Sequence, residues 1–124
     1  MKIIAAIALG GALGSVLRYL MASGVQIAAG RQFPFGTLSV NVLGSFAIGL
    51  LYVWLVERSM ASLELRAFLL VGVLGGFTTF SSFSLETFNL ITEAAYGRAL
   101  ANVAFSVVLC VAGTWLGVAF GRQL

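Results

Sequence analysis

The sequence contains no histidine, one cysteine and one proline, and only 9% of its residues are charged. Soluble domains carry about a quarter charged residues, so this shortage excludes an ordinary soluble domain. The single cysteine, Cys110, excludes an internal disulfide and any cysteine-based metal site. Acid–base catalysis and metal-assisted hydrolysis both depend on carboxylate or imidazole side chains, and this chain has only four carboxylates and no imidazole. We therefore do not expect an enzyme.

Long apolar runs dominate what is present, since 60% of the 124 residues are hydrophobic. A helix that crosses a bilayer needs about 20 predominantly apolar residues. Four windows reach that length: Ile3–Ser23, Thr37–Val56, Leu65–Ala95 and Ala99–Gly121. The first run is too long for a signal peptide, and three similar runs follow it. We therefore predict an all-α membrane protein in which residues 1–124 form a single domain of four transmembrane helices.

The third window is too long for one straight crossing and contains an adjacent glycine pair, Gly75 and Gly76. Glycine destabilises a helix interior, and nearby Ser and Thr hydroxyls can satisfy the backbone carbonyls that a break releases. These features predict a third helix that is broken at the glycine pair. Its two half-helices would meet near the middle of the bilayer.

Basic residues are almost evenly divided between the two ends of the predicted helices. An even number of spans places Lys2, Arg58, Arg66 and Arg122 at one end and Arg18, Arg31 and Arg98 at or near the other. The positive-inside rule needs an asymmetry to choose an orientation. Two hypotheses stay open: insertion in one orientation, or insertion in both orientations followed by antiparallel pairing. The net charge of +3 is attributed to arginines at the membrane surface, and no nucleic-acid partner is expected.

Glycines recur four residues apart at three places: Gly10 and Gly14, Gly72 and Gly76, and Gly113, Gly117 and Gly121. Small residues at this spacing let helix backbones approach closely within lipid. The pattern fits packing within one chain and contact between two chains equally well, so both interpretations stay open.

Three polar or charged residues within the spans need a partner. Asn41 lies inside the second window, where its amide can form an interhelical hydrogen bond or donate to an anion in a pore. Arg18, near the end of the first window, can extend to the interface or place a positive charge at the mouth of an anion pathway. Glu86 has no basic residue near it in sequence. An intramembrane carboxylate is a candidate functional residue, but the sequence does not decide its role.

The segment GGFTTFSSFS, residues 75–84, combines phenylalanines at every third position with hydroxyls between them. A phenylalanine stripe in a membrane helix usually faces lipid or packs against another helix. Lipid would reject the five hydroxyls beside it, however, so these should face protein or a permeating species. Ring edges are partially positive and can, together with hydroxyl donors, solvate an anion. Carbonyls freed near the glycine pair would in turn suit an alkali cation.

Three segments, GGFTTFSSFSLET, FGTLSVNVLGS and GGALGSVLRY, closely resemble the Fluc (CrcB) family of bacterial fluoride channels. The resemblance extends over nearly the whole chain. It implies an antiparallel, dual-topology homodimer in the inner membrane, with two pores that export fluoride passively. It also implies a structural sodium ion at the dimer centre, which is not transported and is held by the backbone carbonyls of Gly75 and Thr78.

The resemblance also implies roles for individual side chains. The family's pore-lining and vestibule positions correspond here to Phe80, Phe83, Asn41, Ser81, Ser82, Arg18 and Glu86. Where many relatives have a serine in the fourth span, the best alignment has Cys110, whose thiol is a weaker donor than a hydroxyl. Ser106, one turn earlier, is a candidate to compensate for it. Asn102 stands where some relatives have a tyrosine.

Two other classes of membrane protein are compatible with a short four-helix chain. A small multidrug exporter of similar size needs an ionisable carboxylate in its first span, and the first window has no acidic residue. A non-transporting membrane subunit would leave the hydroxyl-rich segment without a reason. The predicted function is the one that the resemblance implies, a passive fluoride channel.

Overall fold

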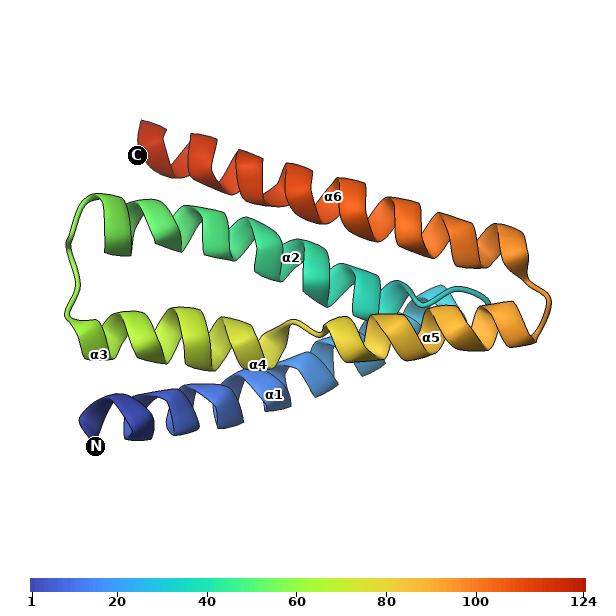
Figure 1. Ribbon diagram of the computed structural model, residues 1–124, viewed down its shortest axis with the longest axis horizontal. Coiled ribbons are helices and arrows are strands. Elements are labelled where there is room, and N and C mark those ends of the chain that lie inside the picture. Colours follow the sequence, from blue (N-terminus) through green and yellow to red (C-terminus); the bar gives the residue numbers. More distant parts are fainter.

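The computed structural model describes residues 1–124, and all of its regular structure is helical (Figure 1). Its elements are, in chain order, α1 (Lys2–Ala29), α2 (Phe35–Tyr52), η1 (Val53–Glu57), α3 (Leu63–Arg66), η2 (Ala67–Leu74), α4 (Gly75–Phe77), α5 (Phe80–Thr92) and α6 (Tyr96–Gln123). The π-helices η1 and η2 continue α2 and α3 directly, so each belongs to the same span as the helix before it. The predicted all-α class is confirmed.

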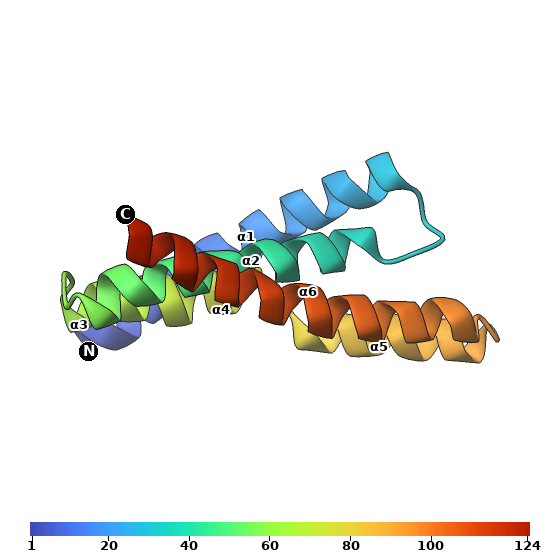
Figure 2. The same ribbon diagram turned by 90° about the horizontal axis from the view of Figure 1, so that it is seen from above.

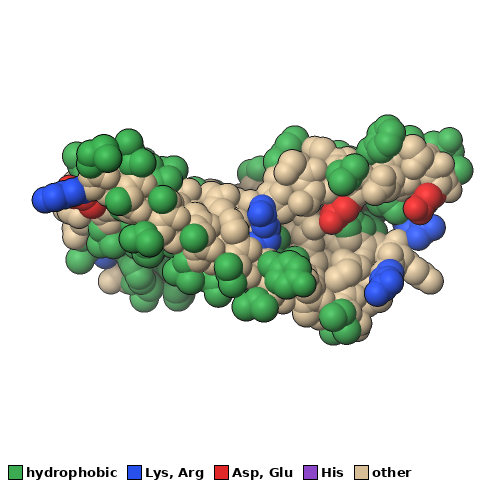
Figure 3. Space-filling view, turned by 90° about the horizontal axis from the view of Figure 1, so that it is seen from below, with side chains coloured by type: hydrophobic (Ala, Val, Ile, Leu, Met, Phe, Trp, Pro, Cys, Tyr) green, Lys and Arg blue, Asp and Glu red, His purple; other side chains and the backbone are tan.

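Four helical segments are long and apolar enough to cross a membrane: Lys2–Ala29, Phe35–Glu57, Leu63–Thr92 and Tyr96–Gln123. Each contains or overlaps one of the four predicted windows, so the prediction of four candidate spans is confirmed. The space-filling view shows apolar side chains along the whole length of the molecule, with most charged side chains toward its two ends (Figure 3). Such a surface suits a lipid environment, because the hydrocarbon core excludes charge.

The spans run back and forth along one axis. Both termini and the α2–α3 connection lie at one end, and the α1–α2 and α5–α6 connections lie at the other (Figure 1). α6 packs along α2, and α1 packs along η2. Figure 2 shows that the end of α1 and the beginning of α2 diverge from α5 and α6. As a result, α5 packs mainly against α6.

Glycines allow both of the long helix contacts. A Cβ on Gly72 would lie 2.9 Å from the Cα of Gly10, and a Cβ on Gly117 would lie 3.0 Å from the backbone nitrogen of Leu50. The remaining members of the spaced pattern also face backbone or side chains of their own chain: Gly14, Gly76, Gly113 and Gly121. The glycine spacing therefore serves packing within one chain, which is one of the two interpretations that the sequence left open.

The third span is interrupted, but not at the glycine pair. Gly75 has helical torsion angles (φ −63°, ψ −37°), and α4 continues to Phe77. Helical geometry stops at the next two residues, Thr78 (φ −86°, ψ 157°) and Thr79 (φ −151°, ψ 118°), and α5 then begins at Phe80. The predicted position of the break at the glycines is therefore wrong.

The physical reason for this displacement lies in what each residue contacts. Gly76 stays helical because its missing side chain makes room for α1: a Cβ there would lie 2.7 Å from the carbonyl oxygen of Gly11. Thr79, by contrast, starts a new helix. Its hydroxyl accepts a hydrogen bond from the Ser82 N–H at 3.2 Å, which is a side-chain N-cap for α5.

Candidate functional site

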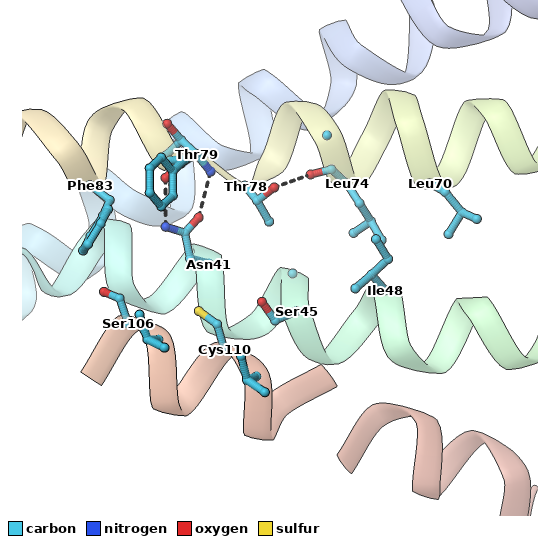
Figure 4. A pocket seen from close by; sticks show the side chains of 15 residues that line it. Asn41, Ser45, Ile48, Leu70, Leu74, Thr78, Thr79, Phe83, Ser106 and Cys110 are labelled. Carbon is cyan, nitrogen blue, oxygen red and sulfur yellow. Dashed lines mark hydrogen bonds between the residues drawn. The ribbon is translucent and has the colours of Figure 1, made fainter. Parts of the chain in front are cut away.

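A pocket of about 440 Å³ lies beside the interruption, between α2, the third span and α6 (Figure 4). Its lining combines apolar side chains with amide, hydroxyl and thiol groups. Seven predicted site residues line it: Asn41, Gly75, Thr78, Phe80, Phe83, Ser106 and Cys110. Four others lie outside the lining: Arg18, Ser81, Ser82 and Glu86. The fold thus brings most of the predicted site together from three separate spans.

Asn41 bridges α2 to the interrupted backbone. Its Nδ2 donates to the Thr79 carbonyl oxygen at 2.9 Å, and its Oδ1 accepts from the Thr79 N–H at 2.7 Å (Figure 4). Both backbone groups have left the helical pattern, so the amide replaces the partners that the helix would have supplied. The interhelical hydrogen bond considered from the sequence is therefore present. An amide nitrogen carries two N–H donors, and only one of them is used within the chain.

Hydroxyl groups cluster at the start of α5. The Thr79 hydroxyl lies 3.1 Å from Ser82 Oγ and 3.3 Å from Ser81 Oγ. Thr79 is buried, whereas Ser82 is half-buried and Ser81 is exposed. The three side chains form a polar chain that runs from the interruption toward the outer surface of α5.

The two predicted pore rings contact each other but differ in exposure. The ring centroids of Phe80 and Phe83 are 5.2 Å apart, and their planes are inclined by 48°. Phe83 is 9% exposed, whereas Phe80 is 78% exposed. Phe77, the third member of the stripe, is buried and lies against the backbone near Gly44. The phenylalanine stripe is therefore divided. Phe77 packs inside the chain, whereas the ring of Phe80 is exposed beside the pocket.

Arg18 reaches the interruption. Its Nη1 donates to the Thr78 carbonyl oxygen at 3.3 Å, across 60 positions of sequence. The Thr78 hydroxyl meanwhile donates to the Leu74 carbonyl oxygen at 2.9 Å. Neither of the two sequence-based interpretations of Arg18 included this contact, in which the guanidinium satisfies a carbonyl that the interruption released.

Backbone carbonyls at the interruption are the available donors for a cation. The Thr79 N–H, which an uninterrupted helix would direct at the Gly75 carbonyl, donates to Asn41 instead. The Thr78 carbonyl accepts from Arg18 but has a second lone pair. The chain has no cluster of three or more histidine, cysteine or acidic side chains that could hold a metal. Oxygen donors of this kind fit a small alkali cation, which is the ion that the resemblance implies.

Glu86 lies away from the pocket, on α5. Its Oε1 accepts a hydrogen bond from the Thr37 hydroxyl at 2.7 Å, and its buried Oε2 has no partner. The contact ties α5 to the start of α2. It does not assign Glu86 a place in an ion pathway.

α6 contributes the last polar wall of the pocket. Ser106 and Cys110 are one helical turn apart and both line it (Figure 4). Asn102, a further turn back and only 1% exposed, instead donates to the Thr87 hydroxyl at 2.9 Å. Thr87 in turn donates to the Phe83 carbonyl oxygen at 2.8 Å. Asn102 therefore fixes α6 to α5 beside the pocket.

Two of the lining residues with polar side chains were not among the predicted site residues. Thr79 caps α5 and receives Asn41, and Ser45 lines the pocket one turn after Asn41 on α2. The four-residue spacing of Asn41 and Ser45 is a sequence signal that could have identified Ser45. Nothing local distinguishes Thr79 from Thr78, because its partner lies on another span.

These features define a class of protein. Interrupted helices with freed backbone groups and polar side chains at membrane depth are typical of ion channels and transporters. Residues 5–118 match the sequence model of the family described as "CrcB-like protein, Camphor Resistance (CrcB)". The chain therefore belongs to the CrcB family.

Similar proteins cover 94% to 100% of the chain. The sequence is 52% identical over 124 residues to the fluoride-specific ion channel FluC of Geobacter sulfurreducens, with 100% of both chains covered. It is 51% identical over 117 residues to FluC of Coxiella burnetii (94% of each chain) and 51% identical over 121 residues to FluC of Magnetococcus marinus (98% of each chain). The resemblance stated from the sequence is confirmed. These names describe channels, which confirms the expectation of a non-enzymatic family.

Proposed function

We propose that this protein is a fluoride channel that exports fluoride passively across the bacterial inner membrane. The observation that carries the proposal is the similarity to relatives named as fluoride-specific channels, which extends over the full length of both chains at 52% identity. The polar pocket at the interrupted span supports it, because amide, hydroxyl and aromatic groups supply anion donors without a fixed charge.

The functional unit in this proposal is an antiparallel homodimer with two pores. The pocket is lined partly by polar groups, which would be costly to leave facing lipid. Phe80 is 78% exposed beside it, and a Cβ on Gly75 would meet no atom within 4 Å. A second copy of the chain, inserted in the opposite orientation, would cover this surface. The near-even distribution of basic residues permits both orientations.

A structural sodium ion would bind between the two copies, on the carbonyl oxygens of Gly75 and Thr78 from each. It would compensate the partial negative charge that these carbonyls concentrate at the dimer centre. Arg18 already donates to the Thr78 carbonyl, so the guanidinium and the sodium ion would share that oxygen. The ion is held rather than transported.

Fluoride would move along the hydroxyl and ring surfaces beside the pocket. Ser81 and Ser82 extend the hydroxyl chain from the interruption, and the rings of Phe80 and Phe83, which contact each other, would present their edges to the ion. The free N–H of Asn41, with Ser106 and Cys110 opposite, would add further donors. From the resemblance alone, Arg18 would lie at the vestibule and Glu86 near the pore end. Several modest donors acting together can replace the water that fluoride loses.

Efflux from liposomes tests the proposal. Purified protein is reconstituted with potassium fluoride or potassium chloride inside, and ion-selective electrodes follow release after valinomycin is added. A passive fluoride channel should release fluoride rapidly only when valinomycin carries the compensating potassium, and it should release little chloride. Fluoride release equal to that from protein-free liposomes would refute the assignment. Release without valinomycin would indicate coupled exchange instead of passive conduction.

A further inference from the structure

A second groove, of about 780 Å³, lies at the end of the molecule that carries the α1–α2 and α5–α6 connections. One side of the groove is formed by the α1–α2 connection and the start of α2, and the other side by the first half of α6. Its lining is Ala29, Gly30, Arg31, Gln32, Phe33, Phe35, Leu38, Arg98, Ala101, Phe105 and Leu109. The groove thus has two arginines, no acidic residue and seven apolar side chains.

The two arginines lie where lipid headgroups would be. Arg31 follows the end of α1 at Ala29, and Arg98 is in the first turn of α6. Arg98 donates to the Gln32 carbonyl oxygen at 2.8 Å, which uses one of its five N–H donors. Arg31 is exposed and has no ion-pair or hydrogen-bond partner within the chain. A guanidinium pair with spare donors is suited to a phosphate group.

The apolar part of the groove extends from these arginines into the membrane. From Arg98 to Leu109 an α-helix rises about 16 Å, roughly the depth of one bilayer leaflet. Phe105 is 52% exposed and Leu109 is 41% exposed along this path. An acyl chain could therefore lie on the same surface whose outer end holds the charges.

This groove faces away from the pocket at the interrupted span. Phe105 and Leu109 are each two residues from Val107, which lines that pocket. Two residues correspond to about 200° around a helix, so the groove and the pocket lie on opposite sides of α6. A second copy that covers the pocket would leave the groove exposed to lipid.

We propose that the groove binds an anionic phospholipid, with its phosphate on Arg31 and Arg98 and an acyl chain along Leu38, Phe105 and Leu109. The charge complementarity and the one-leaflet depth both favour this occupant. Basic pockets between membrane helices commonly bind such headgroups, and each arginine near the surface strengthens binding about fivefold.

Native mass spectrometry of the full-length protein in detergent tests the site, with phosphatidylglycerol and phosphatidylcholine of identical acyl chains as probes. Wild-type protein should retain phosphatidylglycerol in preference to phosphatidylcholine. Arg31→Gln, which breaks no contact within the chain, should weaken that retention about fivefold. Ala101→Phe, which fills the groove without changing charge, should weaken it too. The matched control is Lys2→Gln with Arg66→Gln, which removes two positive charges from the opposite end and should leave retention unchanged.

Equal retention of both lipids, or an equal loss in the control, would overturn the proposal. Displacement of the lipid by soluble glycerol phosphate would show that the arginines bind free phosphate instead. Disulfide cross-linking between two copies carrying Phe105→Cys, in a Cys110→Ser background, would show that a second chain occupies the groove. Fluoride efflux is measured in parallel on the same variants. A variant that loses lipid retention but keeps fluoride efflux shows that the lipid site and the channel function are independent.

Discussion

Replacing Asn41 with alanine tests how the interruption of the third span is held. Asn41 makes two hydrogen bonds to the extended backbone of Thr79, at 2.9 Å as donor and 2.7 Å as acceptor. Thr79 is only 8% exposed, so water cannot readily replace the amide. Alanine would leave a buried N–H and a buried carbonyl without these partners.

The expected loss of stability follows from the Thr79 N–H and carbonyl, which would both lose their partner. An unsatisfied buried polar group costs about 1–3 kcal/mol, so the substitution should lower the free energy of unfolding by about 2–6 kcal/mol. Ser45→Ala is the matched control. Ser45 lies one turn further along α2 and lines the same pocket, but its hydroxyl makes no hydrogen bond within the chain. Its loss should therefore change stability by much less.

Unfolding in mixed micelles, followed by the fluorescence of Trp54 and Trp115, measures both variants against the wild type. Fluoride efflux from liposomes is measured on the same preparations. If Asn41→Ala is as stable as Ser45→Ala, the amide does not hold the interruption and the reasoning fails. If efflux then falls at unchanged stability, the role of Asn41 is that of a pore donor alone.

Replacing Phe80 or Phe83 with isoleucine should cost about 1.5 kcal/mol of stability or less but should lower fluoride efflux steeply, because it removes the partially positive ring edge. Wild-type efflux from a folded variant would assign the rings to packing. Complete replacement of sodium by a large organic cation should abolish efflux if the carbonyls of Gly75 and Thr78 hold sodium, and unchanged efflux without sodium or another small alkali ion would exclude that site. A cysteine tag at one terminus should be labelled from both sides of intact inner membranes; labelling from one side alone would refute dual topology.

Hydrophobicity along the chain was sufficient to predict the helical class and the four candidate spans. Each of these properties depends on residues that are neighbours in sequence, because a run of about 20 apolar residues is long enough to cross the bilayer whatever it packs against. The family could also be inferred from the sequence, since the segment at residues 75–84 is specific.

The position of the interruption could not be predicted this way. Helix propensity favoured Gly75 and Gly76, but propensity is a small term that tertiary contacts override. Gly76 is used for close packing against α1, and Thr79 departs from helical geometry because Asn41 satisfies its backbone. The residues around Thr79 do not indicate this contact, because Asn41 lies 38 positions away in the sequence.

Only the tertiary structure decided which polar groups meet. It brings Arg18 to the Thr78 carbonyl across 60 positions, and it directs the spaced glycines at helices of the same chain. The physical reason is that a buried hydrogen bond requires a donor and an acceptor within about 3 Å, and helix packing alone determines which residues of different spans come that close.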